Sequence, residues 1–296
     1  VKFEKVKGYR MWHSDVELYA VKSKGKIISY FALDLYPRDG KYGHACAIDM
    51  VGGRVDPNSG GYVAPIAVML ANFPNPHKRR QSLLTHREVE TFFHEFGHIM
   101  HMVLTKAKYL SQSGTNTAWD FVEAPSQMLE NWVWNEEIVN LLSMHFKTKK
   151  HLPKEMLNNL IKGKKHMVSF GVMSQLIYAL FDLKLHTEKI IKPEVLFARL
   201  KKQFTGIILP KTQIFPAGFG HMVGYDAGYY GYMWSKVFAA DMFTRFKEAG
   251  MLNKKVGLEY KEIILEKGSS EDEMKLLEQF LKRKPNNKAF LKEIGL

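Results

Sequence analysis

The chain has 296 residues, of which 43 are Lys or Arg and 30 are Asp or Glu, so its formal net charge is +13. A hydrophobic fraction of 46% with 25% charged residues is ordinary for a folded protein and excludes a disordered chain. One cysteine, Cys46, excludes an internal disulfide framework and a cysteine-rich zinc module, and it fits a reducing compartment. No run approaches the roughly 18 consecutive apolar residues of a membrane span, and no leader pattern opens the chain. We therefore expect a cytoplasmic, globular protein that does not enter a membrane.

Three apolar runs in the first third of the chain have the length of strands. Residues 26–34, 42–50 and 62–73 each stop at a cluster of Pro, Gly, Asn or Asp, which are turn-forming residues. Short runs with tight breaks favour a small antiparallel sheet.

From Thr85 onward the apolar residues recur at helical spacing. Thr85 and Glu88 fit a capping box, in which the Thr hydroxyl and the Glu carboxylate each accept from the backbone N–H of the other residue. An apolar stripe then follows at steps of three and four: Val89, Phe92, Phe96, Ile99, Met100 and Val103. Most of the remaining chain also reads as helical, over residues 124–140, 153–160, 167–188, 193–204, 229–249, 259–266 and 271–283.

The most informative motif is the HExxH sequence at residues 94–98. His94 and His98 lie one helical turn apart, so both imidazoles can reach one cation, and Glu95 can face a water on that cation. Zinc lowers the pKa of such a water, and a carboxylate must take its proton as the water attacks a carbonyl. The alternative, a solvated helix face, is less favoured because the capping box fixes the helix register. His101 is expected near the same face as a bystander.

A catalytic zinc usually has three protein ligands, so a third should come from another element. Asp120, Glu123 and Glu130 are the carboxylate candidates in the segment that follows the HExxH helix. Pro125 suits the first turn of a helix, which places Glu123 at the start of a helix beside the first one.

These motifs together resemble the thimet oligopeptidase and neurolysin family of zinc peptidases. The resemblance rests on HEFGH at residues 94–98 and FVEAPSQMLENW at residues 121–132. It implies a bound Zn²⁺ ion with His94, His98 and Glu123 as ligands, and Glu95 as general base. Asp120, Glu90 and Glu130 remain alternatives for the group that orients the imidazoles through their free N–H.

The segment from residue 219 to 232 is rich in Gly and Tyr. Its phenols and imidazole can donate hydrogen bonds to a developing oxyanion, whereas an aromatic core is an equally weighted reading for Tyr229 and Tyr230. By resemblance to the family's Gly/Tyr loop, His221, Tyr225 and Tyr232 contact substrate and its transition state. One residue fewer than in the family pattern separates His221 from Tyr225.

Residues 43–47 resemble the family's strand before the metal helix. If this is an edge strand, Gly43 and Ala45 could pair with an extended peptide through the main chain. Cys46 is interpreted as a small packing residue and not as a reactive thiol.

The positive charge is spread over short Lys and Arg clusters, including residues 78–80, 147–150 and 162–165, with no nucleic-acid-binding module beside them. A solvated basic surface is favoured over nucleic-acid binding.

The resemblance implies a mainly α fold: a zincin-type catalytic domain with a small antiparallel sheet before the metal helix and a helical bundle after it. We expect one domain over 1–296, β-rich over 1–80 and helical over 85–296. Family members carry an additional N-terminal helical half that has no counterpart here. The expected function is zinc-dependent hydrolysis of short peptides; the alternative is a noncatalytic peptide-binding remnant or a fragment that needs a partner chain.

Overall fold

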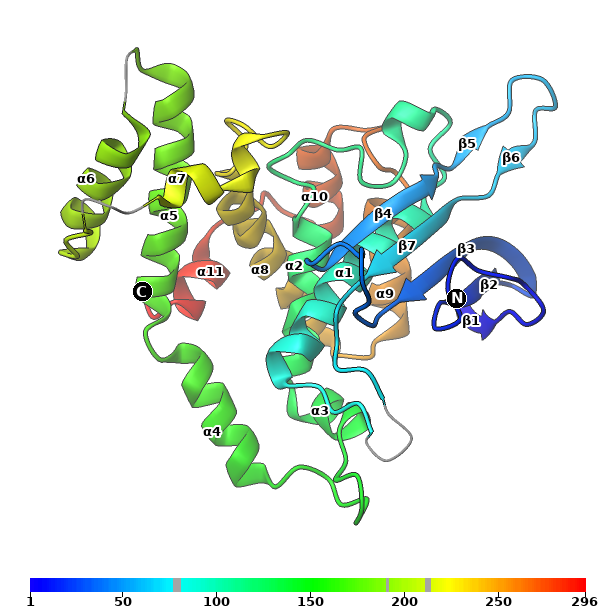
Figure 1. The fold of residues 1–296 in the computed structure, drawn as a ribbon. Coiled ribbons are helices and arrows are strands. Elements are labelled where there is room, and N and C mark those ends of the chain that lie inside the picture. Colours follow the sequence, from blue (N-terminus) through cyan, green and yellow to red (C-terminus); the bar gives the residue numbers. More distant parts are fainter. Residues whose placement is uncertain (77–80, 190–191, 211–213) are drawn as a thin grey trace.

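A computed structural model describes residues 1–76, 81–189, 192–210 and 214–296, arranged as an N-terminal sheet beside a larger set of helices (Figure 1). The mainly helical class with a small sheet is therefore confirmed. The basic cluster at residues 78–80 lies outside the described residues.

The main sheet has five strands in the order β1-β2-β3-β7-β4, and β5 pairs with β6 in a separate ribbon. The strand bounds are β1 Lys2–Lys5, β2 Glu17–Ser23, β3 Lys26–Asp34, β4 Cys46–Val51, β5 Arg54–Val55, β6 Tyr62–Val63 and β7 Ile66–Leu70. Strand β3 has the predicted bounds, whereas β1 and β2 were not predicted, and the run at 62–73 divides at Pro65.

An antiparallel sheet was expected, but the observed sheet is mixed. Strand β7 inserts between β3 and β4, running parallel to β3 and antiparallel to β4. The chain makes the β4, β5 and β6 excursion before it returns, so β3 and β7 enter the sheet from the same end. This arrangement leaves β4 at the edge of the sheet.

The helices follow the sheet in the chain. Their bounds are α1 His86–Leu104, α2 Ala124–Glu130, α3 Glu136–Leu142, α4 Lys154–Lys165, α5 Val168–Thr187, α6 Pro193–Thr205, α7 Phe215–Gly218, α8 Gly231–Ala249, α9 Lys254–Tyr260, α10 Glu273–Leu281 and α11 Lys288–Glu293. Short turns are 3₁₀ helices at Leu110–Gln112 (η1), Asn131–Trp134 (η2) and Gly220–Met222 (η3), and a π-helical turn at Lys261–Leu265 (η4). The predicted helix at 124–140 is interrupted, because Asn135 leaves the helical region and caps α3 with its side chain.

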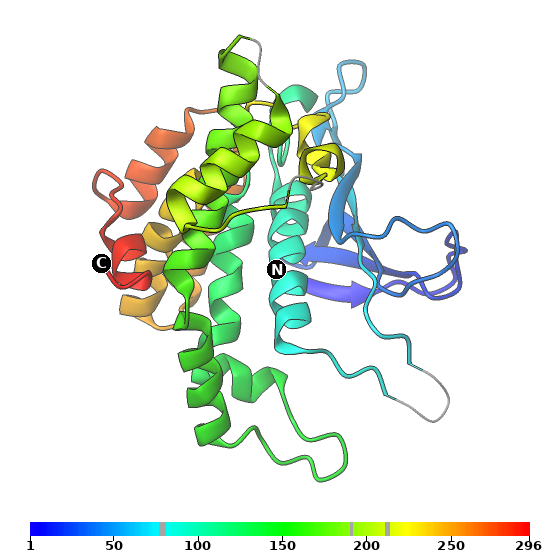
Figure 2. The same ribbon diagram turned by 60° about the vertical axis from the view of Figure 1, so that its left-hand side comes forward.

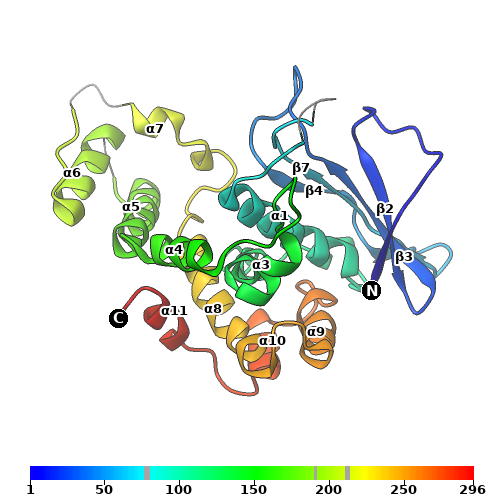
Figure 3. The same cartoon turned by 90° about the horizontal axis from the view of Figure 1, so that it is seen from below.

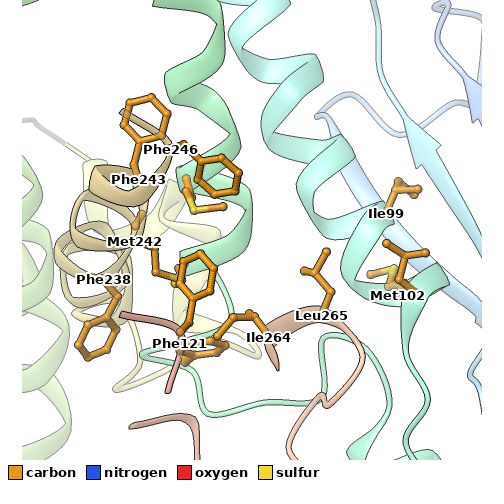
Figure 4. Packing of buried hydrophobic residues seen from close by; sticks show 14 of the residues in the cluster. Ile99, Met102, Phe121, Phe238, Met242, Phe243, Phe246, Ile264 and Leu265 are labelled. Atoms are coloured by element: carbon orange, nitrogen blue, oxygen red, sulfur yellow. The ribbon is translucent and has the colours of Figure 1, made fainter. Parts of the chain in front are cut away.

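Helix α1 lies between the sheet and α2 (Figures 1 and 3). It contacts β3, β4 and β7 on one side and α2 on the other, and α2 packs in turn against α8. The main core fills these layers. Figure 4 shows part of it: Ile99 and Met102 lie on α1, Ile264 and Leu265 lie on η4, and Phe121, Phe238, Met242, Phe243 and Phe246 lie farther from the sheet.

A second core joins α5 and α6 to the segment at 215–232. Figure 2 shows α5 and α6 side by side at a distance from the sheet. The members of this second core include Phe181, Phe197, Phe219 and Tyr229. Within the described ranges, α5 is also the one helix long and apolar enough to cross a membrane by length and composition, a test that core helices of soluble proteins pass as well.

Candidate metal centre

Helix α1 begins as its sequence predicts. Thr85 is the N-cap in the extended region, its Oγ1 accepts from the Glu88 N–H, and the Glu88 carboxylate accepts from the Thr85 N–H, so the capping box is complete. This start fixes the register of the helix. The rings of His94 and His98 consequently lie one turn apart, with centroids 5.0 Å from each other.

Glu123 approaches these two rings from α2. It is the N-cap residue of α2, with Pro125 in the first turn, and its Oε2 lies 3.3 Å from His94 Nε2 and 3.2 Å from His98 Nε2. The Ser126 hydroxyl donates to the same oxygen at 2.9 Å, which orients the carboxylate. One donor atom from each of the three residues lies within 4.8 Å of the others, so the structure brings together the ligand set that the sequence predicts.

Gly97 allows α1 and α2 to come this close. A Cβ at this position would lie 2.5 Å from the Cα of Ser126 and 3.1 Å from the carbonyl oxygen of Pro125. Both atoms belong to the backbone of α2, so no side-chain rotation would relieve the clash. The glycine inside HExxH therefore helps to place Glu123 beside the histidines.

The donor set fits a zinc ion. Two imidazole nitrogens and one carboxylate oxygen are the ligand types zinc prefers, and three protein ligands leave a coordination position open. Burial acts to raise the pKa of Glu123, but hydrogen bonds to His94 and His98 outweigh it and hold this pKa well below its usual value. Glu123 is thus ionised, as a ligand must be.

Glu130 is the residue that contacts the remote nitrogen of His94. Its Oε1 lies 2.7 Å from His94 Nδ1, whereas Glu90 accepts a hydrogen bond from Trp134 Nε1 at 2.6 Å. Asp120 uses its backbone carbonyl to accept from Ser235. Of the three candidates left open by the sequence, Glu130 therefore has the geometry to orient a liganding imidazole.

Glu95 lies beside the two histidine ligands. Its side chain is largely buried, and burial raises the pKa of its carboxyl group, opposed by His94 and His98. The backbone of Ala47 on β4 also forms a hydrogen bond with this carboxylate. Glu95 is therefore held between the edge strand and the metal ligands, with an elevated proton affinity.

The predicted substrate-side aromatic residues form one cluster. His221 Nε2 lies 3.3 Å from the Tyr232 hydroxyl, and the rings of Tyr225 and Tyr232 stack with centroids 5.4 Å apart. Burial, with the negative charge of Glu123 adding to it, raises the pKa of both phenols. Burial also lowers the pKa of His221. All three groups are thus neutral near pH 7, and both phenols keep the proton that they can donate.

Tyr232 lies in the first turn of α8. Its carbonyl oxygen accepts from Gln127 on α2 at 3.1 Å, which ties it to the helix that carries Glu123. Tyr229, in contrast, is a core residue whose hydroxyl donates to Gln175, and Tyr230 packs against the same cluster. The core reading therefore describes these two tyrosines better than the oxyanion reading.

Strand β4 is an edge strand, as the pairing hypothesis for the substrate requires. It begins at Cys46, so Gly43 and Ala45 lie in the approach to the strand and not within it. Cys46 is half-buried, and burial raises the pKa of its thiol. This protonated state agrees with a packing residue.

His101 is not part of the ligand group, as expected of a bystander, but it is fully buried, because α1 is covered by the sheet on one side and by helices on the other. Burial, with His98 adding to it, lowers the pKa of His101 to about 3. The one-sided periodicity expected of a surface helix does not hold at this end of α1.

Several residues that build the site were not predicted. The roles of Gly97 and Ser126 depend on the contact between α1 and α2, which no sequence pattern indicates. The ring of Trp119 contacts that of Tyr225 in a tilted arrangement, with centroids 4.4 Å apart. Asp182, a lone acid in an apolar stretch of α5, accepts hydrogen bonds from the Gly/Tyr segment, and its isolation among apolar residues was the one available hint.

Comparison with known proteins agrees with this geometry. Residues 1–296 match peptidase family M3. The chain is 40% identical to the Thimet-like oligopeptidase of Dictyostelium discoideum, over 100% of this chain and 45% of that protein. It is 37% identical to oligopeptidase A of Escherichia coli, over 97% of this chain and 43% of that protein. The chain thus spans less than half the length of these relatives.

Solved structures show the same fold at much lower identity. A putative oligoendopeptidase F superposes with a TM-score of 0.60 at 15% identity, over 89% of this chain and 42% of that chain. A carboxypeptidase of Pyrococcus furiosus gives a TM-score of 0.57 at 13% identity, over 89% of this chain and 53% of that chain. The sheet and helices described above therefore recur in these longer chains.

Proposed function

Since this chain belongs to peptidase family M3, we propose that it hydrolyses peptide bonds in short peptides with the help of a zinc ion. The observation that carries this proposal is the convergence of His94, His98 and Glu123 beside a buried Glu95. Several relatives are named oligopeptidases, which supports peptides as the substrate class.

His94, His98 and Glu123 would hold the metal, with Glu130 fixing the tautomer of His94. Zinc, when bound, supplies Lewis-acid polarisation of the scissile carbonyl and lowers the pKa of the attacking water. The protein supplies a rigid set of donors, because α1 and α2 are held together through the close contact at Gly97.

Glu95 moves the proton in this proposal. Its carboxylate takes a proton from the water as the oxygen attacks the peptide carbon, and it then gives that proton to the leaving amine nitrogen as the C–N bond breaks. Burial raises the pKa of Glu95, so its proton affinity lies closer to that of the groups with which it exchanges a proton. One side chain thus serves first as base and then as acid.

Tyr232 donates a hydrogen bond to the oxyanion that forms during attack, and Tyr225 and His221 line the same side. A neutral phenol suits this role because it stabilises developing charge without binding the neutral carbonyl as strongly. Substrate pairs along the open edge of β4, near Gly43 and Ala45.

A chelator experiment tests the proposal. Quenched fluorogenic peptides of graded length are incubated with the protein, with and without a chelator, and zinc is then restored. We expect cleavage that stops with the chelator and returns with zinc, and that is absent in His98→Ala. Folded, zinc-loaded protein that cleaves none of the peptides would instead support the noncatalytic alternative.

A further inference from the structure

One buried carboxylate on helix α5 accepts hydrogen bonds from the backbone of the Gly/Tyr segment at residues 219–232. Asp182 is 0% exposed, and its two oxygens accept from two backbone N–H groups, Ala227 N to Oδ1 and Tyr229 N to Oδ2, each at 2.9 Å. His186 Nδ1 lies 3.1 Å from Oδ1. These acceptor bonds hold the backbone at two points between Tyr225 and Tyr232.

The backbone held in this way has an unfavourable conformation. Ala227 has a φ of 55°, in the left-handed region that residues with a Cβ rarely adopt. Gly228 follows, and a Cβ there would lie 2.1 Å from the Trp119 ring. The turn therefore needs external bonds to persist, and Asp182 provides two of them.

The same turn sets the position of the aromatic cluster. Tyr225 precedes it, stacks on Tyr232 and lies against the tilted ring of Trp119. Tyr229 follows it, and its ring lies edge-on to His221 with centroids 5.0 Å apart. A shift of the backbone at residues 227–229 would move both ends of the cluster relative to the metal ligands.

We propose that Asp182 is a positioning residue that acts on catalysis by holding the turn at residues 227–229 and thereby placing Tyr225 and Tyr232. This inference rests on the proposed peptidase function. Asp182 touches neither the substrate nor the metal ligands in this scheme, so its effect passes through the tyrosines. Tyr232 donates to an oxyanion that forms only during the reaction, and main-chain pairing along β4 does not involve Asp182, so kcat should change more than KM.

The test is a double-mutant cycle between Asp182→Asn and Tyr232→Phe. An asparagine of the same shape has one acceptor oxygen, so it can keep one of the two N–H bonds at most while its NH₂ group faces the other. We expect Asp182→Asn to lower kcat more than about tenfold with KM changed less than about threefold. In the Tyr232→Phe background the same change should cost less than about threefold, because residues that act through one group are not additive.

Asp241→Asn is the matched control. Asp241 is equally buried on α8 and also accepts from charged and backbone donors, Arg283 and the Asn286 N–H, away from the turn. Its loss should lower the melting temperature, and any effect on kcat should multiply with that of Tyr232→Phe. If Asp182→Asn behaves in the same multiplicative way, the positioning role is wrong.

Amide hydrogen exchange gives a readout that needs no activity. The Ala227 and Tyr229 amides should exchange slowly in the wild type, fast in Asp182→Asn and slowly in Asp241→Asn. If Asp182→Asn does not fold, the wild-type measurement still decides, since fast exchange at both amides would overturn the inference. Absence of chelator-sensitive cleavage would defeat the proposed function and leave this exchange result standing.

Discussion

Two carboxylates flank the ring of His94, one at each nitrogen. Glu123 lies at Nε2 and Glu130 at Nδ1. Burial acts to lower the pKa of His94, but the hydrogen bonds to these two carboxylates outweigh it and raise the pKa to about 10. A metal at Nε2 must therefore displace a proton near neutral pH.

This shift predicts how the chelated protein responds to pH. The ordinary pKa of His94 is 6.5, so between pH 6.5 and about 10 the folded state holds a proton that the unfolded state has lost. The stabilisation is full below pH 6.5 and is lost as the pH rises through about 10. We expect the melting temperature of chelated protein to fall across this window, with a weaker fall in His94→Gln. Equal slopes in the two proteins would show that His94 is not the group responsible.

Glu130 should tune metal affinity without binding the metal. In Glu130→Gln the amide can still meet Nδ1, but its negative charge is lost. We expect zinc affinity to fall about 10- to 100-fold, the usual effect of removing a partner of a liganding histidine. Competition with a chromophoric chelator measures the change. Glu136→Gln, an exposed residue paired with Lys154, is the control and should leave affinity unchanged. Equal affinity in all three proteins would contradict the role of Glu130.

At the level of elements, local sequence signals predicted the start of α1, whereas features that depend on contacts far apart in the chain were missed. The capping box at Thr85 predicted the start of α1 because its bonds lie within four residues. The break after α2 was missed, since the apolar spacing continues through residues 131–135 while Asn135 caps a new helix. The parallel pairing of β3 with β7 was missed for the same kind of reason, because strand order is decided by contacts far apart in the chain.

The contact between α1 and α2 gives a prediction at this scale. Gly97→Ala places a Cβ against the backbone of Ser126, so we expect a loss of about 1–3 kcal/mol in the free energy of unfolding and weaker zinc binding as Glu123 moves away. Denaturant unfolding and zinc titration measure the two effects. Gly163→Ala in α4, where a Cβ meets nothing within 4 Å, should be neutral or stabilising. Similar stability and zinc affinity for both variants would show that the approach at Gly97 is unimportant.

For the whole molecule, the sequence predicted the ligand set and the helical class but not how the substrate-side segment is supported. His94, His98 and Glu123 belong to short motifs, and the structure brings them together. The bonds from Asp182 to the segment span 45 and 47 residues, and no local pattern indicates them. The metal ligands come from both sides of the contact between α1, which covers the sheet, and α2, which packs on α8. A metal bound by them would therefore connect the sheet side of the molecule to its helical side.

Proton transfer by Glu95 is the step on which the proposed reaction depends most directly, and Glu95→Gln tests it. Peptide turnover and bound zinc should be measured on the same samples, with Glu90→Gln as the control on the same helix, where the carboxylate accepts from Trp134 instead of facing the ligands. We predict that Glu95→Gln lowers kcat/KM about 10²- to 10⁴-fold with zinc still stoichiometric, while Glu90→Gln stays near the wild type. Near-normal turnover by zinc-loaded Glu95→Gln would contradict the mechanism.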